Sequence, residues 1–298
     1  MTIRVTKRDG SLAPLDISKL QRVTAWACEG ITGTSASEVE IRSAITFYDK
    51  IKTSDVQETL IKSAGNLINE DTPNYQYVAG RLINYHLRKE VYGKFEPDNL
   101  YSHIKRIVAT KFYDSELLDW YTEEEFTTLN KHIDHERDFT ITYIGMEQFR
   151  GKYLIRNRDT GQFYETPQMA YMLIAMTLFH NYDKNIRLKW VKDYYDAISK
   201  FEISLPTPIM AGVRTPERQF ASCVLIESGD SLNSITATTT AIVKYVSERA
   251  GIGIGAGSIR AVNSPVKGGK KKHTGIIPYL KLFQSAVLSC SQGGVSFV

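Results

Sequence analysis

Cysteine is scarce in this sequence, and long apolar runs are absent. Only three cysteines occur in 298 residues, at Cys28, Cys223 and Cys290, and no two of them form a CxxC pair. This scarcity argues against a disulfide scaffold and a zinc site, and it favours a reducing compartment, the cytoplasm. No run approaches the roughly 20 apolar residues that a membrane helix needs. The N-terminus, MTIRVTKRDG, lacks the apolar segment of a secretory signal.

A strong net charge is also lacking. The formal charge of +4 permits ligands that carry phosphate, but it does not by itself indicate nucleic acid. The lysine-rich stretch from Lys267 to Lys272 has no aromatic residues for base stacking beside it, which favours a solvated loop or a phosphate contact. Hydrophobic content of 42% is ordinary for a globular protein, and the length predicts more than one domain.

The first 93 residues predict a small β-cap over a helical bundle. Ile3 and Val5 alternate with polar neighbours, Asp9-Gly10 supplies a turn, and the chain returns through 12–15. Helical patterns follow over 17–27, 39–47, 53–67 and 73–92, with Thr72 as the cap of the last. The second helix is expected to carry Val39, Ile41, Ala44, Ile45 and Phe47.

The segment 94–220 predicts a helical layer. Thr122 and Glu125 form a capping box, and the methionines at 169, 172 and 176 share one helical face, which favours core packing. From 222 the pattern changes to strand (223–227), helix (234–249) and strand (251–254), with a helix over 277–288. Such alternation predicts parallel pairing. The apolar run that starts at Cys223 is short enough for a buried strand.

Two single features have competing interpretations. A buried cysteine such as Cys223 is by itself most often an inert small hydrophobe. The glycines from Gly251 to Gly257 are typical of close backbone approach, but they follow a helix and lack GxGxxG spacing, so a dinucleotide site is not favoured.

Several long motifs, taken in order, resemble the large (catalytic) subunit of aerobic class I ribonucleotide reductase. The resemblance extends from Val5 to Val295. Its motifs are VTKRDGS, SLPTPIM, RTP-R-QF-SC followed by GDS, SERAGIGI followed by HTG, and SCSQGGV. It implies an α/β protein with a helical N-terminal part: an ATP-cone at 1–93, a helical domain at 94–220, and the N-terminal part of a ten-stranded α/β barrel at 221–298. That barrel is expected to be incomplete, with only its first strands and helices present.

In the ATP-cone, the resemblance implies that the hairpin covers a nucleotide. Lys7 and Arg8 would meet phosphates, and Thr53 and Lys89 would complete the site. Gln57 stands where some members have His, so inhibition by dATP is not settled by the resemblance. The residues that would line the base and sugar are Ala13, Pro14, Leu15, Asp16, Ile17, Ser18 and Lys19.

In the barrel, the resemblance identifies Cys223 as a redox-active thiol that is oxidised as the substrate is reduced. Its partner cysteine and the radical-bearing cysteine have no counterpart in this sequence. Thr207, Ser222 and Gly251 would bind the substrate together with Cys223. The specificity site would contain Asp230, Ser231, Leu232, Arg260 and Lys267, where Lys267 replaces the usual Arg. The loops at 255–272 and 290–295 would sense the effector.

The implied activity is reduction of ribonucleoside diphosphates to deoxyribonucleoside diphosphates by a thiyl-radical mechanism. The expected partners are a separately made C-terminal fragment, a di-iron small subunit that supplies the radical, and a second copy that dimerises through the effector region. Electrons would come from thioredoxin or glutaredoxin, with ATP and dNTPs as effectors and no covalently bound cofactor. No membrane or nucleic-acid partner is expected, and the location would be the cytoplasm, that of a host if the source is viral. The alternatives are an inactive nucleotide-binding regulatory remnant and a truncated product.

Overall fold

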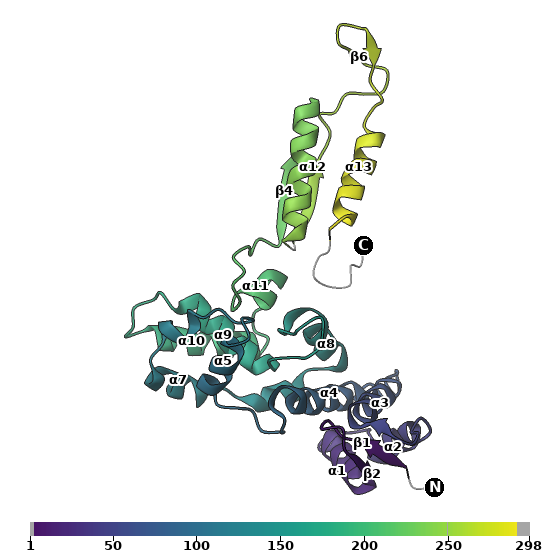
Figure 1. The fold of residues 1–298 in the computed structure, drawn as a ribbon, viewed down its shortest axis with the longest axis vertical. Helices are drawn as coiled ribbons and strands as arrows, with labels where there is room; N and C mark the ends of the chain where they lie inside the picture. The colour runs from purple at the N-terminus through teal and green to yellow at the C-terminus, as the bar shows by residue number, and fades with distance from the viewer. Residues whose placement is uncertain (1–2, 249, 291–298) are drawn as a thin grey trace. The chain divides into compact units, whose positions relative to one another are not determined.

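The computed structural model describes residues 3–248 and 250–290 (Figure 1). The chain divides into two compact units, the first containing residues 1–205 with 214–216, and the second 206–213 with 217–298. The boundaries at 93 and 220 stay predictions. The first unit contains β1 (Arg4–Thr6), β2 (Leu12–Pro14), α1 (Ile17–Cys28), α2 (Ala36–Ala44), β3 (Ile51–Lys52), α3 (Thr53–Gly65), α4 (Tyr75–Tyr92), α5 (Leu100–Val108), α6 (Leu117–Trp120), α7 (Glu123–Asn130), η1 (His135–Thr140), α8 (Tyr143–Gln148), η2 (Phe149–Tyr153), α9 (Pro167–Phe179) and α10 (Arg187–Ser199). The second contains α11 (Thr207–Gly212), β4 (Cys223–Glu227), α12 (Leu232–Ser247), β5 (Gly251–Gly255), β6 (Pro265–Val266), β7 (Lys271–Lys272) and α13 (Ile277–Leu288).

The predicted N-terminal hairpin is confirmed. Strands β1 and β2 pair antiparallel with Val5 opposite Ala13, and Gly10 takes the positive φ of 81° that the turn requires. A third strand, β3, was not predicted because two residues are too short to show a pattern. It pairs in parallel with β1, placing Ile51 beside Val5. Together with Val56, these two residues form a small core beneath the cap.

The predicted helices of the first unit are present, with corrections at two places. Helix α4 begins at Tyr75 instead of Pro73, because the residues after Thr72 form a preceding turn. Ile45 and Phe47 were predicted within the second helix but lie beyond its end, and Ile41 and Ile45 are 66% and 82% exposed. Helix α2 ends at Ala44, and it is Val39 and Ser43 that face inward.

The helical layer is built around α9, whose residues from Pro167 to Met176 are all buried. The methionines are therefore core residues, and the capping box of Thr122 and Glu125 at the start of α7 is confirmed. A fully buried ion pair lies in the same unit, between Glu165 and Arg214. The Glu165 carboxylate also accepts hydrogen bonds from Tyr113 Oη at 2.7 Å and Ile155 N at 2.7 Å.

In the second unit, β4 and β5 pair in parallel as predicted, with Cys223 opposite Gly251. Helices α12 and α13 pack against each other and cover one face of this pair (Figure 1). Ile226, Ile252 and Ile254 face that core. Isoleucines of both strands therefore pack one face of the sheet against the core.

The expectation of a buried β4 strand was wrong for the other face. Leu225 is 88% exposed, and Cys223 and Glu227 are exposed as well. Within residues 3–248 and 250–290, no element covers this face. The glycines of β5 lie beside these exposed side chains. A Cβ at Gly253 would lie 2.6 Å from Leu225 Cδ2, so the missing side chain at Gly253 leaves room for Leu225.

The segment between β5 and α13 contains a short antiparallel hairpin, β6–β7, that was not predicted. Lys267 and Gly268 both have positive φ at its turn. Within the described ranges, no helix is long and apolar enough to span a bilayer, and no cluster of His, Cys, Asp or Glu has a metal-binding arrangement. Arg249 and the predicted loop at 291–295 lie outside the described residues.

Candidate functional site

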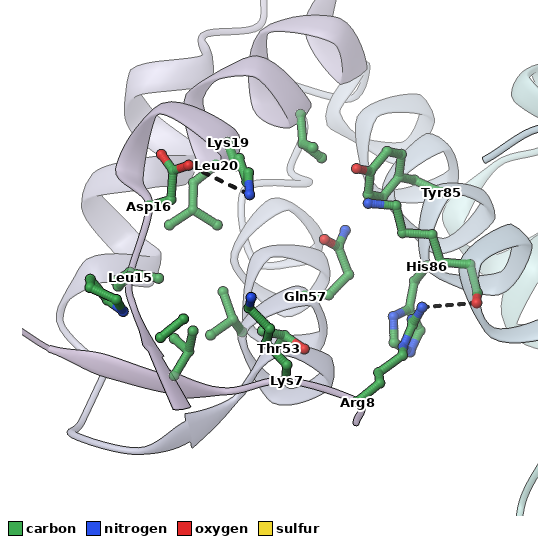
Figure 2. Close-up of a pocket in the computed structure, with 16 residues that line it drawn as sticks. Lys7, Arg8, Leu15, Asp16, Lys19, Leu20, Thr53, Gln57, Tyr85 and His86 are labelled. Carbon is green, nitrogen blue, oxygen red and sulfur yellow. Dashed lines mark hydrogen bonds and ion pairs between the residues drawn. The ribbon is translucent and has the colours of Figure 1, made fainter. Parts of the chain in front are cut away.

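A cavity of about 410 Å³ lies beneath the hairpin of the first unit. Figure 2 shows Lys7 of the cap and Gln57 and Tyr85 of the helices pointing toward the same space. All predicted ATP-cone residues except Ile17 and Ser18 line this cavity. The lining residues are Val5, Lys7, Arg8, Ala13, Pro14, Leu15, Asp16, Lys19, Leu20, Val23, Thr53, Val56, Gln57, Tyr85, His86 and Lys89.

Helical geometry explains why Ile17 and Ser18 do not line the cavity. The residues of α1 and its cap that do line it are at positions 16, 19, 20 and 23, the spacing of one helical face. Ile17 lies on another face and is 62% exposed. Ser18 is exposed, and its hydroxyl donates to Asp16 Oδ1 at 2.6 Å. The prediction took a continuous stretch, whereas only one face of the helix lines the cavity.

Positive charge is concentrated around the cavity. Lys7 and Arg8 come from the hairpin, Lys19 from α1 and Lys89 from α4. Arg8 Nη1 donates to Lys89 O at 2.8 Å, which ties the hairpin to α4. Lys89 Nζ lies 4.3 Å from the centre of the Tyr85 ring. Four cations beside an apolar wall can hold the phosphates of a nucleotide while its base is buried.

Thr53 and Gln57 add polar groups from α3. Thr53 is the first residue of this 13-residue helix, so its hydroxyl lies next to unpaired backbone N–H groups and the positive end of the helix dipole. Gln57 is one turn further on and is 9% exposed. Its Nε2 donates to Leu82 O at 3.4 Å.

The predicted site omitted several lining residues, notably Tyr85 and His86, and Gln57 was named only as a departure from the family pattern. Helical spacing could have found them. Gln57 is four residues after Thr53, and His86 and Tyr85 are three and four residues before Lys89, so each shares a helix face with a predicted residue. The missed apolar lining residues are Val5, Leu20, Val23 and Val56.

Two titratable lining residues have shifted pKa values, Asp16 and His86. The hydrogen bond from Ser18 lowers the pKa of Asp16, and His86 shows the opposite kind of environment, a buried base. Burial lowers the pKa of this imidazole to about 4, and Glu58 acts in the opposite direction. The imidazole Nε2 lies 3.6 Å from Glu58 Oε1 and 3.9 Å from Glu90 Oε2. Because its pKa lies well below 7, His86 contributes no positive charge at neutral pH.

In the second unit, three predicted substrate-binding residues lie together. Gly251 N donates to Ser222 O at 2.7 Å, and Ser222 Oγ lies 3.8 Å from Cys223 Sγ. A Cβ at Gly251 would approach Cys223 Sγ to 3.7 Å, so this glycine keeps space open beside the thiol. Cys223 is exposed at the start of β4. The thiol is therefore accessible on the uncovered face of the sheet.

Thr207, the fourth predicted substrate residue, is exposed at the start of α11. Among residues 3–248 and 250–290, no hydrogen bond joins it to Ser222, Cys223 or Gly251. Its place in the substrate site stays a prediction.

Two of the predicted specificity residues, Asp230 and Arg260, form an ion pair. The Asp230 carboxylate accepts from Arg260 N at 2.8 Å and pairs with the Arg260 guanidinium. Hydrogen bonds from Arg260 lower the pKa of Asp230 below its ordinary value. Ser231 caps α12 by accepting from Ser234 N at 3.1 Å, and Leu232 is 69% exposed. Lys267 is exposed at the β6–β7 turn.

Comparisons with known proteins identify matches along most of the chain. Family models match at residues 3–90 (ATP cone domain), 139–218 (ribonucleotide reductase, all-alpha domain) and 221–296 (ribonucleotide reductase, barrel domain). The ribonucleoside-diphosphate reductase 1 subunit alpha of Escherichia coli K12 is 59% identical over 98% of this chain and 38% of the relative. The corresponding alpha subunit of Enterobacteria phage T4 is 49% identical over 98% of this chain and 39% of the relative. That of Helicobacter pylori is 33% identical over 98% and 36%. The chain therefore spans less than two fifths of the length of these curated relatives.

Proposed function

Because the chain belongs to the ribonucleotide reductase large-subunit family, whose alpha subunits it matches in their N-terminal region, we propose that it forms the regulatory and part of the substrate-binding machinery of a ribonucleoside-diphosphate reductase. The first unit binds ATP or dATP as an effector. The second unit contributes a redox thiol and a site that senses which deoxynucleotide is bound.

The observation that carries the regulatory part is the cavity beneath the hairpin. Residues from four separate segments converge on it, and its charge and apolar wall suit a nucleoside triphosphate. The ATP cone domain match covers the same residues, 3–90. Sequence motif, geometry and family therefore support one ligand class.

The catalytic part rests on Cys223. In the proposed reaction, two thiols are oxidised to a disulfide while the 2′-hydroxyl of a ribonucleoside diphosphate leaves as water. Cys223 supplies one thiol, held by the first residue of a strand and open to a substrate beside Gly251. The second thiol and the radical cysteine belong to barrel segments beyond the residues matched here. Activity therefore depends on the remaining strands, for which a separate C-terminal fragment is the predicted source.

Further partners follow from the same proposal. A di-iron small subunit supplies the radical, thioredoxin or glutaredoxin reduces the disulfide, and a second copy docks at the effector region. The alternative is a regulatory remnant that binds nucleotides without catalysis. It is favoured by one contrast in the structure: the cavity is walled by its own unit, whereas the face that carries Cys223 is uncovered by residues 3–248 and 250–290.

Reduction of CDP distinguishes the two functions. The assay mixes this chain with ATP and a small subunit, with and without the candidate C-terminal polypeptide, and repeats the full mixture with Cys223→Ser. We expect turnover only in the full mixture, and its loss in the variant. Ser247→Ala, a change at an exposed serine of α12 in the same unit that belongs to no predicted site, serves as the matched control and should retain turnover. A stable complex without turnover would contradict the enzyme function and leave the nucleotide-binding remnant.

A further inference from the structure

His86 connects the cavity to a charged cluster behind it. The side chain comes from the middle of α4, lines the cavity, and is only 10% exposed. Figure 2 shows its ring beside Arg8 of the hairpin. A ligand whose phosphates lie against Arg8 and Lys89 would therefore also lie close to this imidazole.

Charged groups face the imidazole from every element around it. Helix α3 contributes Glu58 and Asp55, and α4 itself contributes Glu90. Arg8 approaches from the hairpin and Arg150 from η2. Arg150 Nη2 donates to Glu58 Oε1 at 2.7 Å, the same oxygen that lies 3.6 Å from His86 Nε2. Glu58 is thus shared between the imidazole and a guanidinium.

The protein's own groups hold His86 neutral. Burial is the largest cause of the lowered pKa of about 4, and Arg150 and Arg8 add to it, while Glu58 and Asp55 oppose it. Glu90 lies further from the imidazole than Glu58 does, with its Oε2 at 3.9 Å, and burial raises the pKa of this carboxyl, whose Oε1 accepts from Phe163 N at 3.1 Å. A change in charge on the cavity side would therefore shift the protonation equilibrium of His86.

We propose that binding of a nucleoside triphosphate in this cavity protonates His86 and draws it into an ion pair with Glu58. The inference rests on the proposed nucleotide binding and adds its regulation. Negative phosphate charge offsets Arg8 and Lys89 and directly favours the imidazolium. The bound ligand supplies the stabilisation, and a proton from solvent balances the step.

The shared carboxylate carries the effect away from the cavity. Once His86 is positive, it competes with Arg150 for Glu58 Oε1, and Arg150 retains Glu147 Oε1 at 3.2 Å as its other partner. Arg150 belongs to η2, a single π-helical turn. Such turns are rare in proteins as a whole, and those that occur are often found at functional sites. Nucleotide binding thereby changes the ion pairs of Arg150, which hold this π-helical turn in the helical layer.

The sign of the pH dependence follows from linkage. The pKa of His86 is higher in the complex than in the protein alone, so binding takes up a proton between the two values. Affinity for the triphosphate rises as the pH falls through this window. The gain ends near pH 4, where the imidazole is protonated without ligand as well.

Calorimetric titration with ATP in two buffers of different ionisation enthalpy measures the proton uptake. We expect the wild type to take up about half a proton more than His86→Gln at pH 6.5, with no difference at pH 8. The matched control is His135→Gln, since burial also lowers the pKa of His135 to about 4 and it does not line the cavity. This control should behave like the wild type. Binding at other sites is common to all three proteins and cancels in the difference.

Two further results decide the inference. Glu58→Gln keeps the imidazole and removes its counter-charge, so the uptake at pH 6.5 should fall toward that of His86→Gln. Hydrogen exchange over residues 147–153 should change on ATP binding in the wild type and stay unchanged in His86→Gln. Equal uptake in the wild type and His86→Gln, with ATP still bound, would overturn the inference alone. Absence of ATP binding to the wild type would overturn the proposed nucleotide site and the inference with it.

Discussion

The two candidate sites of this chain differ in how completely the chain builds them. The cavity of the first unit has walls from the hairpin, α1, α3 and α4, all of them within one unit. Cys223 of the second unit lies on an open sheet face beside the 88%-exposed Leu225. Apolar side chains at such positions normally pack against further structure. The first candidate site is therefore enclosed by its own unit, whereas the second is open on one side.

The same contrast appears in the ion pairs. Glu165 and Arg214 are fully buried, and each carboxylate oxygen of Glu165 has protein partners. Asp230 and Arg260 pair near the surface, with 27% and 41% of their side chains exposed. A buried pair depends on both partners, whereas an exposed pair is free to exchange one partner for a ligand.

The largest effect is expected from Glu165→Gln, which leaves the Arg214 guanidinium buried without its counter-charge. We expect a loss of about 3–5 kcal/mol in the free energy of unfolding of the first unit. Tryptophan fluorescence during urea unfolding reports on this unit, which contains Trp26, Trp120 and Trp190. Asp230→Asn is the matched change in the exposed pair and should leave this transition where it is. Equal shifts for both variants would contradict the stated difference between the buried and the exposed ion pair.

A smaller effect is expected at glycines that touch a neighbour. A Cβ at Gly80 of α4 would lie 2.2 Å from the backbone oxygen of Ile141, so Gly80→Ala should cost about 3 kcal/mol. At Gly253 the nearest atom is the end of the exposed Leu225 side chain, which can move away. Gly253→Ala should therefore cost less than about 1 kcal/mol. Thermal unfolding of both variants checks the difference, and a larger loss at Gly253 would contradict it.

The pH dependence of stability should differ between two carboxyl groups. Burial raises the pKa of Asp138 to about 7, so the folded protein binds more protons than the unfolded chain between pH 4 and pH 7. Stability contributed by this group therefore falls as the pH rises through that window. Asp138→Asn should remove this slope and stabilise the first unit by about 2 kcal/mol at pH 8.

The control for this prediction is Asp230→Asn. Arg260 lowers the pKa of Asp230, so its stabilising contribution is present above the ordinary carboxyl pKa and is lost only as the pH falls below it. The slope between pH 4 and pH 7 should be unchanged in this variant. Urea unfolding at several pH values tests both. A slope that survives Asp138→Asn would show that another group titrates.

The smallest effect separates the two faces of β4. Ile226 packs against the core under α12 and α13, so Ile226→Ala should cost about 1 kcal/mol. Leu225 is 88% exposed, and Leu225→Ala should change stability by less than about 0.5 kcal/mol. Hydrogen exchange of the β4 and β5 amides measures the local change. A larger loss from Leu225→Ala would show that the open face is covered in solution.

Features set by neighbouring residues could be predicted from the sequence. The Asp9-Gly10 hairpin, the capping box at Thr122 and the β4–α12–β5 unit all follow from local spacing and turn chemistry, and the structure confirms them. The cationic residues of the cavity were predicted through the family motif, and the structure places them together.

Features set by long-range packing could not be predicted in this way. Strand β3 is recognisable only through its pairing with β1, and the exposure of Leu225 depends on what covers the sheet. The role of His86 depends on Glu58 and Arg150, which come from two other elements. Periodicity places a residue on a face of its own helix, but the partners on that face come from the fold.

ATP binding to this chain, compared among the wild type, Lys7→Ala and Arg260→Gln by calorimetric titration, tests the central claim most directly. The first unit is expected to hold the nucleotide by itself, since its cavity is built from its own residues. Lys7→Ala should therefore weaken binding about tenfold or more through loss of a phosphate contact, whereas Arg260→Gln should leave binding in the cavity unchanged. Binding that is unaffected by Lys7→Ala and lost in Arg260→Gln would contradict the claim.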